Sequence, residues 1–211
     1  MEEVLFDIEF KDALNRLPEK EKDKLIVRFL RKDKKLAKRL HFELVSTDSP
    51  EERRAIVKQR IHVMTLKFAK EFHSPGYLHA DLRFLSGEIN EHVHTTKDKV
   101  GDIELQLYLV SEILTHAHDD LLLARHGHTQ KLYDYLISKV FKTLMLLNKL
   151  HEDLRYDFKE QVEELGILIG QNDSMMRYCI NNGLDVNWLS QWEIPSDLDQ
   201  RYKGLRKMGF L

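Results

Sequence analysis

Histidines crowd the middle of this chain and are its clearest chemical signal. Neutral imidazole is the commonest nitrogen ligand for metal ions in proteins, and a carboxylate one helical turn away can bind the same ion. Glu91 and His94 have that spacing, as do Glu112 and His116. Eight of the eleven histidines fall between residues 73 and 128: His73, His79, His92, His94, His116, His118, His126 and His128.

The register of two antiparallel helices limits which of these groups can meet. If residues 77–95 and 100–126 form a helical hairpin, facing residues have numbers that sum to about 196. His79 then lies close to His116, with Asp120 one turn further along the same helix. The spacing therefore predicts one candidate site for a divalent metal, made by His79, His116 and Asp120.

A compact di-metal centre is disfavoured, because the same register places the two Glu/His pairs about two turns apart. The alternative is that the histidines lie at helix interfaces or on the surface and bind no metal, so no resident cofactor is expected. A metal-dependent enzyme built on His79, His116 and Asp120 is the competing functional class.

A run of cations is the second signal, and it is interrupted only by Asp33. Phosphate groups bind such clusters by charge neutralisation, so nucleic-acid or phosphate binding is an alternative function. The opposing interpretation is an ordinary solvated face, because acidic residues such as Glu21 and Glu43 lie nearby. The candidate nucleic-acid-binding residues are Arg28, Arg31, Lys32, Lys35, Lys38 and Arg39.

Catalytic motifs are missing from the sequence. It contains no phosphate-cradling glycine loop, no nucleophile elbow and no His-Glu-x-x-His pair, so we assign no catalytic residue and favour a protein that is not an enzyme. Cys179, the single cysteine, sits among apolar residues and is predicted to be a buried, inert thiol. The Gly166/Gly170 spacing is typical of close helix packing.

Apolar residues recur at spacings of three and four over residues 50–73, 77–95, 100–126 and 129–169, which predicts long amphipathic helices. No stretch shows the strict alternation of a strand. The fold class is therefore all-α, either an antiparallel helical bundle or a short stack of helix hairpins, with a HEAT-like superhelix as the alternative.

Several local signals predict where the helices begin and end. Ser49, with Glu52 three residues later, forms a capping box at the start of one helix, and Asp33 is expected to cap another. Gly127 is placed to end the helix over 100–126. The stretch 151–157 is highly charged, so we expect a bend or break there.

The predicted organisation is a single all-helical domain over residues 1–211. Within it we expect a basic N-terminal helical hairpin (1–47), a core of long helices (49–170) and an irregular C-terminal tail of short helices (171–211). Glycine, asparagine and proline punctuate that tail. Trp188 and Trp192 lie within it and are expected to dock on the chain's own core.

Composition narrows the functional classes further. The chain is 42% hydrophobic and 32% charged, no apolar run reaches the length of a membrane span, and the first residues are acidic. We therefore expect no membrane association and a cytoplasmic protein. The favoured function is a helical binding or scaffolding module that engages a protein partner, and a homodimer is compatible with the sequence.

Overall fold

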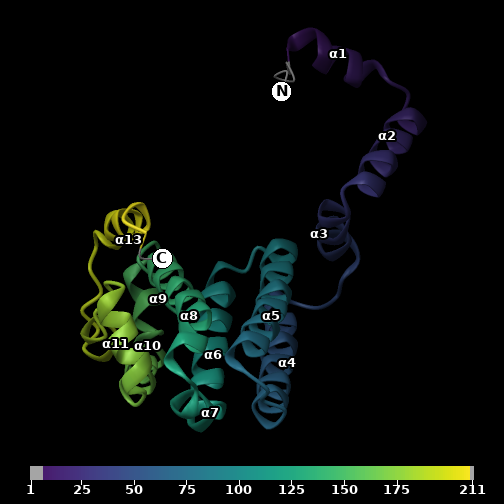
Figure 1. Cartoon of the computed structure of the whole chain (residues 1–211). Helices are drawn as coiled ribbons and strands as arrows, with labels where there is room; N and C mark the ends of the chain where they lie inside the picture. Colours follow the sequence, from purple (N-terminus) through teal and green to yellow (C-terminus); the bar gives the residue numbers. More distant parts are fainter. Residues whose placement is uncertain (1–6, 210–211) are drawn as a thin grey trace. The chain divides into compact units, whose positions relative to one another are not determined.

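The computed structural model describes residues 7–209, and in that range the regular structure is entirely helical (Figure 1). The all-α prediction is confirmed. No helix within this range is long and apolar enough to cross a membrane. In chain order the helices are α1 (Ile8–Arg16), α2 (Glu19–Lys32), α3 (Lys34–Val45), α4 (Pro50–Lys70), α5 (Pro75–Thr96), α6 (Lys99–His116), α7 (His118–Leu123), α8 (His126–Leu147), α9 (Glu152–Tyr156), α10 (Lys159–Gly170), α11 (Asp173–Asn181), α12 (Asn187–Ser190) and α13 (Leu198–Lys207).

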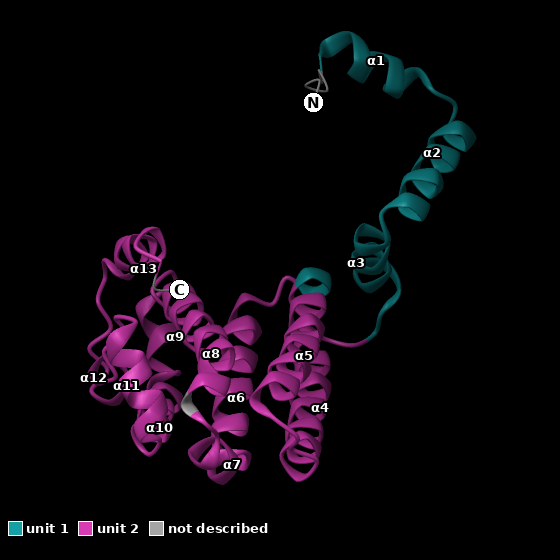
Figure 2. Ribbon diagram, viewed as in Figure 1, with its two compact units in different colours: residues 1–47, 94–96 teal, residues 48–93, 97–211 magenta. Residues whose placement is uncertain are grey.

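The chain divides into two compact units (Figure 2). The N-terminal unit comprises residues 1–47 and 94–96, and the main unit comprises residues 48–93 and 97–211. Whether the whole chain behaves as one domain stays a prediction.

Helices α1 and α3 of the N-terminal unit have side-chain N-caps, whereas α2 begins after Pro18 without one, and none of the three helices buries a residue. The carboxylate of Asp7 accepts the N–H of Phe10 at the start of α1, and Asp33 accepts the N–H groups of Lys35 and Leu36 at the start of α3. The predicted Asp33 cap is confirmed. No residue of the three helices is buried, so the predicted packing of this segment as a helical hairpin stays a prediction.

The main unit is built from helices that pack on the helix two positions further along the chain. α4 packs against α6, and α6 packs against both α8 and α10. α5 reaches α8, where the hydroxyls of Ser86 and Tyr135 lie 2.5 Å apart. α8 in turn contacts α11 and α13, and α10 contacts α11 and α12. This is the arrangement of stacked helix hairpins.

Most of the predicted helix boundaries hold in the main unit. Ser49 and Glu52 form the capping box of α4, with both reciprocal hydrogen bonds present. The predicted break over 151–157 is also confirmed, because the short helix α9 separates α8 from α10 there.

The predicted end of the third long helix is wrong. The chain leaves the helix at Ala117, whose backbone angles are φ −102° and ψ 18°, and α7 follows as a separate short helix. Ala124 and Arg125 are extended, so the turn comes before Gly127, which lies inside α8 instead of ending a helix. Alanine carries no breaker signal, and the apolar spacing continues across the kink.

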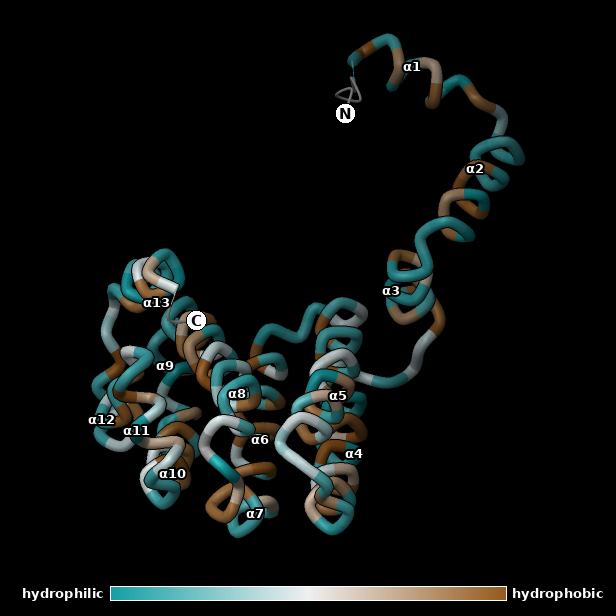
Figure 3. The backbone as a smooth tube through the Cα atoms, viewed as in Figure 1, coloured by the Kyte–Doolittle hydropathy of each residue, from teal (hydrophilic) through white to brown (hydrophobic). Residues whose placement is uncertain are grey.

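One contiguous core fills the main unit, and the C-terminal tail belongs to it. Hydrophobic residues recur among hydrophilic ones along the helices (Figure 3). Trp188 and Trp192 pack against the core, as predicted. A side chain at Gly166 would come within 2.7 Å of the backbone nitrogen of Ser190, so glycine permits the close approach of α10 and α12. Cys179 is buried, and burial raises the pKa of its thiol to about 12, which keeps it protonated and unreactive.

Candidate functional site

Polar side chains line the contact between α4 and α6, and their register shows that the two helices run parallel. The guanidinium of Arg54 lies 3.0 Å from Glu104, and His62 Nδ1 lies 2.6 Å from Glu112. Both pairs join residues fifty positions apart, as parallel helices require. Lys58 pairs with Glu104 at 2.7 Å. We call this row of contacts the α4–α6 seam.

The N-terminal end of the seam is a buried ion-pair network. Arg54 donates two hydrogen bonds to Asp98, at 2.7 and 2.9 Å, and the Gly101 N–H donates a third at 2.8 Å. Burial acts to raise the pKa of Asp98, but the hydrogen bonds from Arg54, Gly101 and His92 outweigh it, and the pKa is lowered. A side chain at Gly101 would collide with Asp98 at 2.0 Å, so this network is tightly packed and structural.

The C-terminal half of the seam holds a half-buried cluster of two imidazoles and a carboxylate. His62 Nδ1 lies 2.6 Å and His116 Nε2 3.4 Å from the same oxygen of Glu112. His116 Nε2 is shielded from solvent and makes no hydrogen bond. The Thr65 hydroxyl lies 3.3 Å from Glu112, and the carbonyl oxygens of Ile61 and His62, at 2.9 and 3.0 Å, are closer acceptors for its single proton. Burial, together with the charge and hydrogen bond of Glu112, raises the pKa of Tyr108 to about 12.

The ligand atoms of this trio lie close enough together to hold a metal ion. One ligand atom from each of His62, Glu112 and His116 lies within 4.8 Å of the other two. Among the described residues, this is the group of at least three His, Cys, Asp or Glu side chains whose ligand atoms lie that close together. Two imidazole nitrogens and one carboxylate oxygen are a ligand set for Zn²⁺ and related transition metals.

The structure does not bring together the residues that the sequence suggested as ligands. His79 of α5 lies against the ring of Tyr135, with ring centroids 5.0 Å apart, and burial with the charges of Arg83 and Lys131 lowers its pKa. Asp120 of α7 lines a separate pocket. Of the predicted trio, only His116 belongs to the cluster.

His79 and Asp120 are not part of the cluster because the helix that packs against this part of α6 is α4 and not α5. The sequence-based register paired α6 with α5, whereas Glu112 and His116 face α4. His62 was not singled out from the sequence. This residue follows Ile61, a member of the apolar stripe of α4, and its partner Glu112 lies fifty residues further along the chain. Its one signal is the four-residue spacing from Arg54 through Lys58 to His62, a polar row on a helix that is otherwise apolar toward the core.

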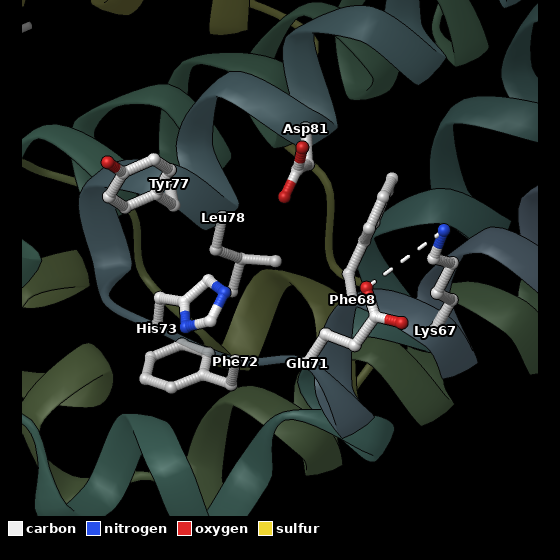
Figure 4. Close-up of a pocket in the computed structure, with 8 residues that line it drawn as sticks. All are labelled: Lys67, Phe68, Glu71, Phe72, His73, Tyr77, Leu78 and Asp81. Atoms are coloured by element: carbon white, nitrogen blue, oxygen red, sulfur yellow. Dashed lines mark ion pairs between the residues drawn. The ribbon is translucent and has the colours of Figure 1, made fainter.

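An open pocket of about 270 Å³ lies where α4 ends and α5 begins (Figure 4). Phe68 and Phe72 form apolar parts of its lining, and His73 and Asp81 are among its polar groups. Burial raises the pKa of Asp81, and the nearby His73 opposes this effect. Lys67 and Glu71 of its lining form an ion pair at 4.0 Å, which is drawn as a dashed line in Figure 4.

The predicted basic residues lie on α2 and α3 as expected from the sequence, with Arg28, Arg31 and Lys32 before the Asp33 cap and the others after it. Most of them are exposed. Arg39 forms an ion pair with Glu43 at 2.7 Å. Because Asp33 accepts backbone N–H groups, its carboxylate is engaged in capping.

Five large apolar side chains of α4 and α5, the first two helices of the main unit, are exposed to solvent. Arg60 of α4 also reaches Glu88 of α5 at 2.6 Å. We call the group the α4–α5 apolar face, and its members, between 42% and 68% exposed, are Ile56, Val63, Leu66, Tyr77 and Phe84.

Comparison of the chain with protein-family models, with curated proteins and with solved structures finds no match.

Proposed function

We propose that this protein is a non-enzymatic binding module that engages a protein partner through the α4–α5 apolar face. The observation that carries the proposal is that five large apolar side chains of two helices, α4 and α5, are between 42% and 68% exposed. Single exposed apolar residues are ordinary, whereas exposed apolar side chains that form one patch are typical of an interaction surface. A cytoplasmic location belongs to the same proposal.

The chemistry of the face favours an amphipathic helix as the docked element. Ile56 and Val63 lie seven residues apart on α4, as do Tyr77 and Phe84 on α5, so each helix presents a stripe one side chain wide. On its opposite side α4 already packs against a parallel helix, α6. A partner helix on the outer side would continue the same helix-on-helix packing.

Photo-crosslinking tests this proposal. A photoreactive residue at Val63 should crosslink to a partner in cells, and the crosslinked segment should be an amphipathic helix with apolar residues at i, i+3 or i+4, and i+7. The double variant Ile56→Glu/Val63→Glu should reduce capture of that partner at least tenfold, because it places charge in an apolar contact.

The matched control is Ile167→Glu/Ile180→Glu, which adds the same charges at apolar positions of α10 and α11 that are 57% and 59% exposed. Capture should survive in this control. Equal crosslinking from Val63 and Ile167, or equal loss in both double variants, would contradict the proposal. A crosslink to a second copy of the chain would instead identify a homodimer face.

Nucleic-acid or phosphate binding through α2 and α3 is the second candidate. It is supported by the exposure of a run of cations whose only intervening acid, Asp33, is engaged in a helix cap. Retention on an anionic polymer should fall with salt, and Lys35→Glu/Lys38→Glu should weaken it. Retention that is independent of salt and of these substitutions would remove this candidate.

A further inference from the structure

We propose that His62, Glu112 and His116 bind one divalent transition-metal ion, with Zn²⁺ as the best-fitting ion, at the seam between α4 and α6. The inference is independent of the proposed protein-binding function, because none of the three residues belongs to the α4–α5 apolar face. It assigns a metal site to a ligand set drawn from two helices that are not consecutive in the chain.

The distances in the cluster suit a small cation. Zinc binds imidazole nitrogen and carboxylate oxygen at about 2.0–2.2 Å, so tetrahedral ligands lie about 3.3 Å from one another. His116 Nε2 and Glu112 Oε2 are already 3.4 Å apart. The His62 contact, at 2.6 Å, is a hydrogen bond and must open by less than 1 Å to admit the ion.

The orphaned nitrogen of His116 points to a ligand. Nε2 is shielded from water and makes no hydrogen bond with any neighbouring group. A buried polar atom without a hydrogen bond has lost its interaction with water, and the contact of Nε2 with Glu112 Oε2, at 3.4 Å, replaces that interaction only weakly. Coordination of a cation by His116 Nε2 and Glu112 would remove this deficit.

The surroundings of Glu112 would hold its carboxylate in place. Tyr108 hydrogen-bonds to it, as second partners commonly do for metal-bound carboxylates, and the Thr65 hydroxyl lies 3.3 Å away. Lys58, the next cation along the seam, pairs with Glu104 at 2.7 Å and lies over the ring of Tyr108 at 5.0 Å.

The site would be open on one side. The side chains of Glu112 and His116 are 15% and 24% exposed, whereas that of His62 is 40% exposed. Three protein ligands leave a fourth tetrahedral position, which on this geometry is filled by water from the His62 side. A bound ion would also join α4 to α6, so metal binding should stabilise the fold.

The test is titration of the full-length chain, prepared without a polyhistidine tag and stripped with chelator, with Zn²⁺ alone in a calorimeter. We expect one ion per chain, and Co²⁺ in its place should give the visible absorption of a tetrahedral site. His62→Ala, Glu112→Gln and His116→Ala should each lower the association constant at least tenfold.

His79→Ala and His151→Ala remove histidines outside the cluster and should leave the association constant unchanged. Zn²⁺ should also raise the melting temperature of the wild type and of His79→Ala, but not that of His116→Ala. Far-UV circular dichroism establishes that each metal-free variant is folded. If His116→Ala fails to fold, Glu112→Gln, which keeps the size of the side chain, decides the question.

Two results would overturn the proposal. The first is the absence of Zn²⁺ and Co²⁺ binding by the stripped, folded protein. The second is binding whose affinity is the same in the wild type and in all folded cluster variants, which would mean adventitious binding by other histidines. In either case the cluster is a contact in which His62 hydrogen-bonds to Glu112 and His116 lies nearby, and it only stabilises the packing of α4 on α6.

Discussion

Helices α1 to α3 and the helices of the main unit have the same amphipathic pattern, but their apolar side chains have different surroundings. In α2, Ile26 and Phe29 are 53% and 59% exposed, and in α3 Leu44 is 78% exposed. In the main unit, Leu85 of α5 and Ile113 of α6 are fully buried. Apolar spacing and caps therefore suffice to form a helix, whereas burial of its apolar side chains requires a partner helix at the right register.

This difference locates the stability of the protein. Burial of one large aliphatic or aromatic side chain contributes about 1.5–3 kcal/mol to the free energy of unfolding. The core of the main unit contains many such side chains. The helices of the N-terminal unit depend on local terms instead: the Asp7 and Asp33 caps, and exposed ion pairs such as Lys24 with Glu21.

The largest predicted contrast concerns phenylalanine. Phe141 is fully buried and packs against Tyr202 with ring centroids 5.2 Å apart, so Phe141→Ala should lower the free energy of unfolding by about 4 kcal/mol. Phe29→Ala, at a residue that is 59% exposed, should change it by less than about 0.5 kcal/mol. Urea denaturation measures both, and equal losses would break the comparison.

A smaller contrast is expected for cations. Arg54→Met would leave Asp98, whose side chain is 6% exposed, without its arginine partner, and Glu104, which is 19% exposed, with Lys58 alone, at a cost of roughly 3 kcal/mol. Lys24→Met removes an ion pair whose side chains are 72% and 52% exposed and should cost less than about 0.5 kcal/mol. If Arg54→Met lowered the free energy of unfolding by less than about 1 kcal/mol, the carboxylates of the α4–α6 seam would have to be accessible to water.

Lys139 of α8 gives a pH-dependent test of burial in the main unit. Burial lowers the pKa of Lys139 from 10.5 to about 8, so between these pH values the unfolded chain binds a proton that the folded chain lacks. The wild type should therefore gain stability relative to Lys139→Met as the pH rises through that window, by on the order of 2–3 kcal/mol.

Denaturation of the wild type and of Lys139→Met at about pH 7.5 and pH 10 measures this change, because other titrating groups act in both proteins and cancel in the difference. A difference in stability that is the same at both pH values would mean that Lys139 is solvated. Lys35→Met in α3, at an exposed position, is the control for general effects of removing a lysine.

Local features of the fold could be predicted from the sequence because they depend on neighbouring residues. The Ser49 capping box and the Asp33 cap need only residues within one turn, and the break over 151–157 follows from charge interrupting an apolar stripe. The kink at Ala117 has no such local signal, so it was missed.

The candidate metal cluster could be predicted only in part, because it depends on which helices are neighbours. The Glu112/His116 pair is visible as a four-residue spacing. His62 becomes its partner only because α4 packs in parallel against α6 and α5 serves as the return helix between them. A short loop suggests that consecutive helices pair, and that assumption led to His79 instead.

The single core of the main unit is expected to carry the stability of the chain, and native-state hydrogen exchange tests this directly. We predict that amides of α6 and α8 exchange only through global unfolding, whereas amides of α2 and α3 exchange through local opening of low free energy and are insensitive to Phe141→Ala. Equal protection of α2, α3, α6 and α8, lost together in Phe141→Ala, would contradict it.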